Sequence, residues 1–253
     1  MNILELPPPE PGIRIHYGPD VNQFGELRVP AGKKPHPVVI FLHGGFWRSR
    51  HDLSHTGHLC VALTGAGFAT WSLEYRRLGQ AGGGWPGTLD DVRQGAAHLE
   101  RIAGPYELDL SRVVAVGHSA GGQLALWLAS QPEVPLQGVV ALAAVSDLWL
   151  AWSLGLSDGV VAQFLGGTPD EFPDRYASCS PVELLPLRTP QRLVHGTKDN
   201  VVPFGMSERF VQISKNGRLV VLNGAGHHEV IDPRSEEWPM VIKNMTEWDS
   251  IPT

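Results

Sequence analysis

The sequence predicts an α/β protein, a three-layer αβα sandwich around a mostly parallel, eight-stranded sheet. Eight short apolar runs recur along the 253 residues and alternate with helical stretches, and strands that alternate with helices form parallel sheets covered on both faces. One of these runs leads directly into a glycine-rich turn with a central serine, a turn typical of the strand-to-helix junctions in such sheets. We expect a single domain over residues 1–253, with an insertion at about 148–188.

The elements follow in order. Strands at 12–17 and 23–29, joined by the turn residues Gly18-Pro19-Asp20, are predicted to pair as an antiparallel hairpin at one edge of the sheet. Thr88, followed by Asp91 three residues later, marks the start of a helix. The other strands are expected at 38–42, 68–75, 112–116, 138–143, 192–195 and 219–222. Helices are expected at 52–65, 88–103, after the serine turn, near Pro203 and at 236–248.

Composition excludes several classes of partner. The net charge is −6, and acidic and basic residues are interspersed, so neither nucleic acid nor an anionic membrane surface is an expected partner. No apolar run approaches the 18 or so residues of a membrane span. Residues 1–11 are rich in proline and do not resemble a signal peptide. Two isolated cysteines, Cys60 and Cys179, suggest no disulfide framework, which favours a cytoplasmic protein. The oligomeric state is left open.

The turn Gly117-His118-Ser119-Ala120-Gly121 carries the first chemical signal. It is a G-x-S-x-G pattern that follows the apolar run 112–116 and precedes an apolar helical segment. A sharp turn of this kind lifts the serine Oγ above the carboxyl edge of a parallel sheet. Its glycines let the strand and helix backbones approach closely. Ser119 is therefore the expected nucleophile.

A second glycine motif, His43-Gly44-Gly45-Phe46-Trp47, ends the strand at 38–42. Loops of this type present backbone N–H groups that act together with the N–H of the residue after the nucleophile. We expect Gly44, Gly45 and Ala120 to supply these donors and to stabilise the oxyanion of a tetrahedral intermediate. The alternative is a glycine turn that only caps the strand.

The acid and the base are expected on two later loops. Asp199 follows the short strand that breaks at Gly196, where a carboxylate can hold a histidine in the required tautomer. Alternatively, Asp199 caps the helix near Pro203, and Asp147 after the strand at 138–143 is a rival acid. The last strand ends in a loop with two adjacent histidines. We favour His227 as the general base, with His228 stabilising the loop or lining the pocket.

The insertion at 148–188 is interpreted as a small cap over the carboxyl edge of the sheet, the alternative being surface helices without a substrate role. Flat aromatic side chains there and on nearby loops favour a compact aromatic or short acyl group. The expected pocket residues are Phe46, Trp47, Trp85, His118, Trp149 and Trp152.

Two further patterns have plainer explanations. His51, His55 and His58 share one face of a predicted helix, yet no paired carboxylate or cysteine lies at metal-ligand spacing there, so we predict no metal site. Arg48 and Arg50 follow the HGG loop and are candidates for binding a substrate carboxylate, although arginine is more often simply solvated.

The chain order Ser119, Asp199, His227 is that of α/β-hydrolases. Further characteristic residues are Tyr17-Gly18, Gln23, Leu27, Pro30, His43-Gly44-Gly45-Phe46-Trp47, Glu74-Tyr75-Arg76-Arg77, Trp85-Pro86, Asp90-Asp91, Gly117-His118-Ser119-Ala120-Gly121-Gly122 and Ser146-Asp147-Leu148. Through them the chain resembles the α/β-hydrolase superfamily over nearly its whole length. Within it the chain looks most like the kynurenine formamidase (arylformamidase) and small serine carboxylesterase group. The resemblance implies the roles assigned above and no cofactor.

We therefore predict a serine hydrolase that cleaves a small carboxylic ester through an acyl-enzyme intermediate. The alternative is an aryl formamidase acting on amides like N-formylkynurenine, which the HGG-x-W loop suggests. A peptidase is less expected. A non-catalytic binding protein with a hydrolase fold is least expected, because no member of the expected triad is missing from the sequence.

Overall fold

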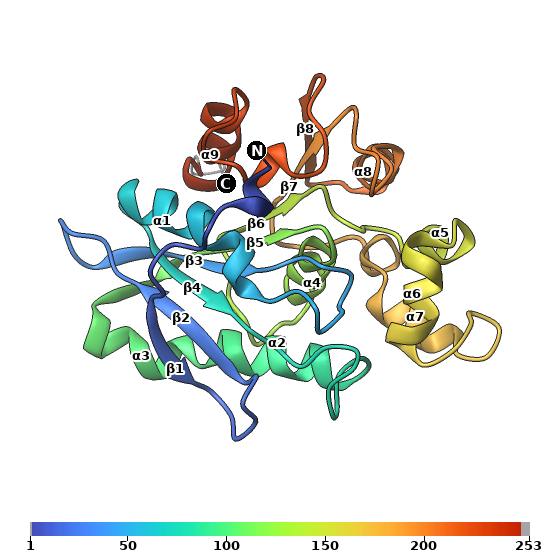
Figure 1. Cartoon of the computed structure of the whole chain (residues 1–253), viewed down its shortest axis with the longest axis horizontal. Coiled ribbons are helices and arrows are strands. Elements are labelled where there is room, and N and C mark those ends of the chain that lie inside the picture. Colours follow the sequence, from blue (N-terminus) through green and yellow to red (C-terminus); the bar gives the residue numbers. More distant parts are fainter. Residues whose placement is uncertain (1, 249–253) are drawn as a thin grey trace.

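The computed structural model of the chain describes residues 2–248, and within them a sheet forms the middle of three layers (Figure 1). Its strands are β1 (Ile13–His16), β2 (Phe24–Arg28), β3 (His36–Leu42), β4 (Ala69–Leu73), β5 (Leu108–His118), β6 (Gly138–Leu142), β7 (Gln191–Gly196) and β8 (Gly217–Leu222). They lie in the order β1-β2-β4-β3-β5-β6-β7-β8. β2 pairs antiparallel with β1 and β4, and the later pairings are parallel. The predicted sheet and its edge hairpin are confirmed.

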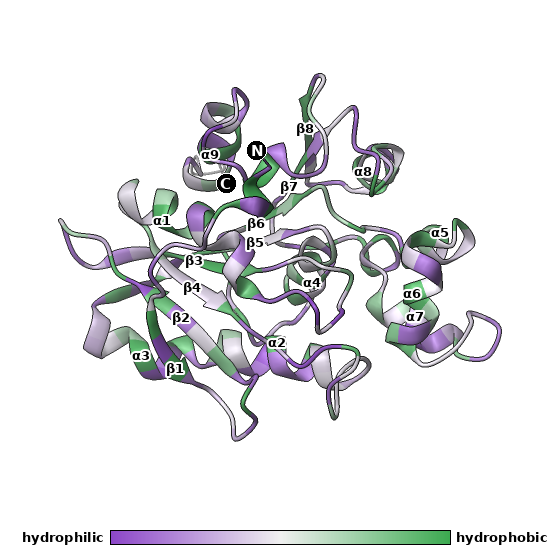
Figure 2. Cartoon of the chain, in the orientation of Figure 1, coloured by the Kyte–Doolittle hydropathy of each residue, from purple (hydrophilic) through white to green (hydrophobic). Residues whose placement is uncertain are grey.

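The helices that follow the strands are α1 (Gly57–Gly65), α2 (Gly87–Ala97), α3 (Leu99–Tyr106), α4 (Ala120–Leu128), α5 (Leu148–Ser153), α6 (Leu156–Leu165), α7 (Pro173–Cys179), α8 (Gly205–Ile213) and α9 (Trp238–Thr246). In Figure 2 the α2 ribbon alternates between hydrophobic and hydrophilic residues, as expected for a helix with one face on the core and one in solvent. No helix within residues 2–248 is both long and apolar enough to cross a bilayer.

Both faces of the sheet are apolar, and this is why helices cover both. Successive side chains of a strand point to opposite faces. Val38, Ile40 and Leu42 of β3 join the core under α2, α3, α4 and α8. Val39 and Phe41 join the opposite core under α1 and α9. The centre of the sheet is thus a rigid platform whose carboxyl edge presents the loops after β3, β5, β7 and β8.

Element boundaries differ from the predicted ones in a few places. The helix expected at 88–103 is divided into α2 and α3 at His98. Glu107, at a φ of 52°, ends α3, and β5 then begins at Leu108, earlier than expected. The last helix starts at Trp238, two residues later than predicted. β5 also ends two residues later than expected, at His118, directly before Ser119.

Residues 148–188 hold α5, α6, α7 and a short 3-10 turn, Pro181–Leu184. Figure 1 shows α5, α6 and α7 together at one side of the molecule, beyond α4. The first turn of α6 is irregular, because Ser157, Asp158 and Gly159 all have positive φ values, of 47°, 56° and 67°. The interruption of the strand–helix rhythm in the sequence therefore corresponds to a separate group of short helices.

Candidate active site

Ser119 stands between the end of β5 and the first residue of α4, in the sharp turn that the sequence predicted. Its φ of 57° and ψ of −120° lie outside the regions that non-glycine residues favour, and such strain is common at functional sites. A Cβ on Gly117 would overlap the backbone of Gly121, and a Cβ on Gly121 would overlap the carbonyl oxygen of Leu42. Both positions therefore require glycine for the strand and helix to meet.

The HGG loop after β3 lies directly beside this serine. A Cβ on Gly44 would be 3.1 Å from Ser119 Cβ, so the two turns are in van der Waals contact. Within residues 2–248, the amides of Gly44, Gly45 and Ala120 donate to no backbone acceptor. Ala120 is the first residue of α4, where an amide has no partner inside the helix. Three backbone donors without a backbone partner thus lie on the two turns that meet at Ser119.

A buried ion-pair network braces the base of the HGG loop. The Glu74 carboxylate accepts from His43 Nε2 at 3.0 Å and pairs with the Arg77 guanidinium at 3.1 Å. The Tyr75 hydroxyl donates to the His43 carbonyl oxygen at 2.7 Å, and the two rings stack 4.4 Å apart. In the sequence, residues 74–77 stand out only as part of a resemblance. Three charged residues directly after an apolar strand are the available signal of a structural role.

Asp199 and His227 are brought together from the loops after β7 and β8. His227 Nδ1 donates to Asp199 Oδ2 at 2.7 Å, and both side chains are buried. Asp199 Oδ1 accepts from the amides of Val201 and Val202, each at 2.8 Å. The alternative that Asp199 caps the helix near Pro203 is wrong, because α8 starts at Gly205 and its N-cap residue is Phe204. One carboxylate oxygen holds its own turn instead, and the other holds the histidine.

A second histidine also binds this carboxylate, and the sequence did not reveal it. His195 Nε2 donates to Asp199 Oδ2 at 3.0 Å, and its Nδ1 accepts from Ser207 Oγ at 2.7 Å. Burial favours the neutral acid, but the hydrogen bonds from His195 and His227 outweigh it and hold the pKa of Asp199 well below its usual value. The carboxylate stays ionised and keeps His227 oriented.

The rival residues have other partners. Asp147 caps α5 by accepting from the Leu150 amide at 2.9 Å, and it pairs with Arg209 at 3.3 Å. His228 is half-buried, with its ring centroid 5.1 Å from that of His227. Burial beside His227 lowers the pKa of His228. Asp147 therefore has a structural role as a helix cap, and His228 is a neighbour of His227.

His118 connects the serine turn to the His227 loop. Its Nε2 donates to the carbonyl oxygen of His227 at 2.9 Å, and the two ring centroids are 4.7 Å apart. Among the hydrogen bonds of residues 2–248, none joins Ser119 Oγ to His227; such bonds are often long in unliganded enzymes. Burial, together with the imidazoles of His227 and His228, holds the pKa of His118 well below its ordinary 6.5.

This buried neutral histidine predicts an acid-sensitive fold. Below pH 6.5 the unfolded chain takes up a proton at His118 that the folded protein does not. The unfolding free energy should therefore fall by about 1.4 kcal/mol per pH unit from this residue alone, from pH 6.5 toward its lowered pKa. The full slope is reached only well below pH 6.5, so His118→Gln should flatten the pH dependence of urea unfolding by about 1 kcal/mol between pH 6.5 and 5.5. His16→Gln, an exposed histidine of β1, is the control, and equal slopes for wild type and His118→Gln would contradict the expectation.

The aromatic residues expected in the pocket differ in their burial and in their contacts. Trp47 is fully enclosed by the protein, so its ring faces the core and not a solvent-open pocket. Trp85 is partly exposed, with the Arg175 guanidinium 4.0 Å above its ring. Trp149 packs 5.2 Å from the ring of Tyr176. Phe46 and Trp152 are half-buried beside the larger core.

The remaining sequence signals are also placed. Arg48 bonds to the Ser157 carbonyl oxygen, and Arg50 Nε donates to His51 Nε2 at 3.1 Å. Within the described residues, no three His, Cys, Asp or Glu side chains are arranged to hold a metal ion.

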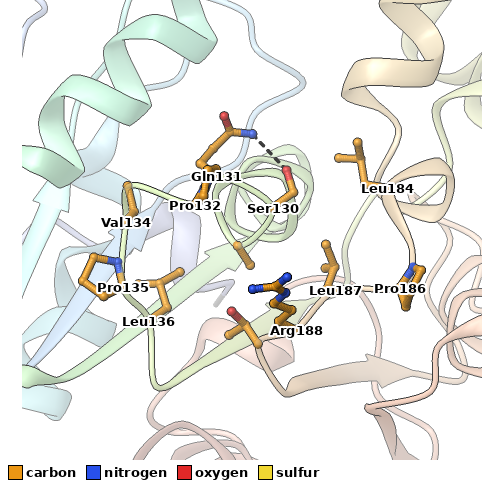
Figure 3. A pocket seen from close by; sticks show the side chains of 12 residues that line it. Ser130, Gln131, Pro132, Val134, Pro135, Leu136, Leu184, Pro186, Leu187 and Arg188 are labelled. Carbon is orange, nitrogen blue, oxygen red and sulfur yellow. Dashed lines mark hydrogen bonds between the residues drawn. The ribbon is translucent and has the colours of Figure 1, made fainter.

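A pocket of about 490 Å³ lies before the first residues of β6 and β7, and Arg188 points toward its centre (Figure 3). That is the amino edge of the sheet, opposite Ser119.

Comparisons with known proteins place the chain in a family. The BD-FAE family model matches residues 27–213, well over half of the chain. Esterase LipC of Mycobacterium tuberculosis is 26% identical over 85% of this chain and 59% of that protein. A probable isoprenylcysteine alpha-carbonyl methylesterase of Oryza sativa is 25% identical over 85% and 58%. The chain thus spans less than two thirds of the length of these curated relatives.

Solved structures share the fold. A truncated carbohydrate esterase from gut microbiota superposes with a TM-score of 0.80 at 19% identity, covering 98% of this chain and all of the other. Esterase Est2 of the planctomycete Thermogutta terrifontis, with propionate bound, gives 0.73 at 20% identity, covering 93% and 92%. The family match shows that the chain belongs to the BD-FAE family, and its fold is that of an α/β-hydrolase.

Proposed function

We propose that the protein is a serine carboxylesterase that cleaves small carboxylic esters through an acyl-enzyme intermediate. The observation that carries the proposal is the 2.7 Å bond between His227 Nδ1 and Asp199, on loops that share the carboxyl edge of the sheet with the strained Ser119. That bond leaves Nε2 of His227 as the free proton acceptor. Relatives named as esterases support the ester as the reacting bond.

In the proposed reaction, Ser119 Oγ attacks the ester carbonyl carbon while its proton passes to His227 Nε2. The carbonyl π electrons move to the oxygen, which the amides of Gly44, Gly45 and Ala120 stabilise as an oxyanion. Collapse of this intermediate breaks the bond to the alcohol, which leaves with the proton from His227. A water molecule then repeats the sequence on the acyl-enzyme, and the carboxylic acid is released with Ser119 restored.

The substrate is proposed to be compact, with a short or aromatic acyl group. Residues 148–188 are proposed as a cap over the site. This segment contributes Trp149 and Trp152, whose flat rings are half-buried. Flat rings favour compact apolar groups. The Thermogutta terrifontis esterase bound propionate, a short acid, and this supports the same size range by analogy.

The second candidate is an aryl formamidase acting on amides like N-formylkynurenine. The motif His43-Gly44-Gly45-Phe46-Trp47 suggests it. The same donors would serve a formamide carbonyl as well as an ester carbonyl. Nothing in the proposed chemistry differs between the two until the leaving group departs. The choice between ester and formamide is therefore a question of rates.

We expect kcat/KM to be highest for p-nitrophenyl acetate or butyrate and to fall steadily toward the palmitate, because a compact pocket lacks room for a long chain. The measurement is a series of p-nitrophenyl esters with purified protein, with N-formylkynurenine assayed beside them. A steady rise from butyrate to palmitate would contradict the compact pocket. A value for N-formylkynurenine far above every simple ester would make the formamidase the better assignment.

A further inference from the structure

The backbone after Gly44 is held in an unusual conformation. Gly45, Phe46 and Trp47 all have positive φ values, of 105°, 51° and 55°. Glycine adopts such values at little cost, but phenylalanine and tryptophan do not. Backbone strain of this kind persists only where the surrounding structure determines it. Something outside the loop must therefore hold the last two residues in place.

The Trp47 side chain is anchored on both sides. Its fully buried ring stacks on Phe164 of α6, with the centroids 4.4 Å apart and the planes at 11°. Its Nε1 donates to Gln123 Oε1 of α4 at 3.1 Å. Gln123 Nε2 in turn donates to the Cys179 carbonyl oxygen at the end of α7, at 2.9 Å. The indole thus joins the loop to α4, which begins beside Ser119, and to α6.

The main chain next to Trp47 is fixed as well. The Leu78 amide donates to the Trp47 carbonyl oxygen at 2.8 Å. Arg48 reaches α6, where its guanidinium donates to the Ser157 carbonyl oxygen at 2.9 Å and to Gln163 Oε1 at 3.1 Å. Two consecutive residues of the loop are therefore attached to the same helix of the 148–188 segment.

We propose that Trp47 is a positioning residue for the oxyanion donors: locked between Phe164 and Gln123, it holds the strained loop so that the Gly44 and Gly45 amides face Ser119. The inference rests on the proposed esterase function. Because its ring is enclosed, Trp47 acts through the backbone and does not touch the substrate. This proposal also assigns a structural role to the 148–188 segment, because Phe164 of that segment supports the oxyanion loop.

A residue with this role affects the transition state more than substrate binding. An oxyanion forms only after attack, so displaced donors lower kcat and leave KM nearly unchanged. Loss of one oxyanion donor typically costs about 10²–10³ in kcat. A displaced loop that keeps part of its hydrogen bonding should cost about 10- to 100-fold. If Trp47 instead lined the substrate pocket, its loss would raise KM.

The test uses Trp47→Leu, Phe164→Leu and the conservative Trp47→Phe, which keeps a flat ring against Phe164. Each is assayed with p-nitrophenyl butyrate for kcat and KM, and with an aryl trifluoromethyl ketone, whose serine adduct places an oxyanion in the same position. Leu63→Ala is the control. Leu63 is fully buried in α1, in the core on the opposite face of the sheet, so it destabilises the fold without touching the loop.

We expect kcat to fall about 10- to 100-fold in Trp47→Leu and Phe164→Leu, with KM within about threefold of wild type. The ketone should bind more weakly by the same factor as kcat/KM, Trp47→Phe should retain more activity than Trp47→Leu, and Leu63→Ala should keep its kcat. If Trp47→Leu does not fold, Phe164→Leu decides alone.

Unchanged kcat in folded Phe164→Leu, or a rise in KM at constant kcat, would overturn the positioning role. In either case an active wild type leaves the esterase assignment standing. An inactive wild type that also fails to bind the ketone would overturn the esterase assignment, and the positioning role with it.

Discussion

Ser119→Ala should lower kcat by about 10⁶, which is the loss seen when a triad serine is removed elsewhere. The hydroxyl is the only atom deleted, and the glycines that allow the turn remain in place. The folded structure should therefore survive. The measurement is kcat with p-nitrophenyl butyrate, together with thermal unfolding to show that the variant is folded.

Ser49→Ala provides the matched control for this loss. Ser49 is an exposed serine shortly after the HGG loop, so deletion of its hydroxyl should leave kcat unchanged. A folded Ser119→Ala variant with wild-type turnover would show that another group is the nucleophile.

Asp199→Asn should lower kcat by about 10⁴. The carboxylate accepts from both His227 Nδ1 and His195 Nε2, whereas an asparagine can turn its NH₂ group toward His227 and stabilise the wrong tautomer. His227→Ala should lose most activity for the complementary reason, the absence of a proton acceptor for Ser119.

The rival pair supplies the controls. Asp147→Asn removes a charge that pairs with Arg209 and caps α5, and His228→Ala removes a ring beside the base, so both should lose far less activity. If Asp147→Asn and His228→Ala instead lose most activity, the acid and the base are misassigned. That result would leave the assignment of the serine nucleophile untouched.

The sheet was predictable because each strand carries its own local signal. β3 shows this most clearly, since 38–42 is a continuous apolar run and all five of these side chains are fully buried. Such runs are expected where helices cover both faces of a sheet. Boundaries were less predictable, because they depend on single residues such as Glu107, whose left-handed conformation ends α3.

The proximity of Asp199 and His227 was also predictable, because both follow strands whose carboxyl ends lie at one edge. The support around them was not. Glu74 meets His43 across 31 residues of sequence, and no local pattern encodes such a pair. His195 occupies a strand position inside β7, and no pattern in the sequence indicates its bond to Asp199.

Trp47 illustrates the same difficulty. A tryptophan that follows a glycine loop at a carboxyl edge resembles a pocket residue in sequence. Its burial depends on Phe164, which comes from a segment far along the chain. Where such a segment folds back cannot be derived from composition or periodicity, and the structure was needed to place the indole in the core.

The most direct test of the central claim is active-site labelling of the wild-type protein with a p-nitrophenyl alkylphosphonate, followed by peptide mass spectrometry. The proposed mechanism predicts one adduct per chain, located on Ser119, with parallel loss of esterase activity and no labelling of Ser119→Ala. An adduct on a different residue that accounts for the lost activity, or full activity after Ser119 has been modified, would contradict it.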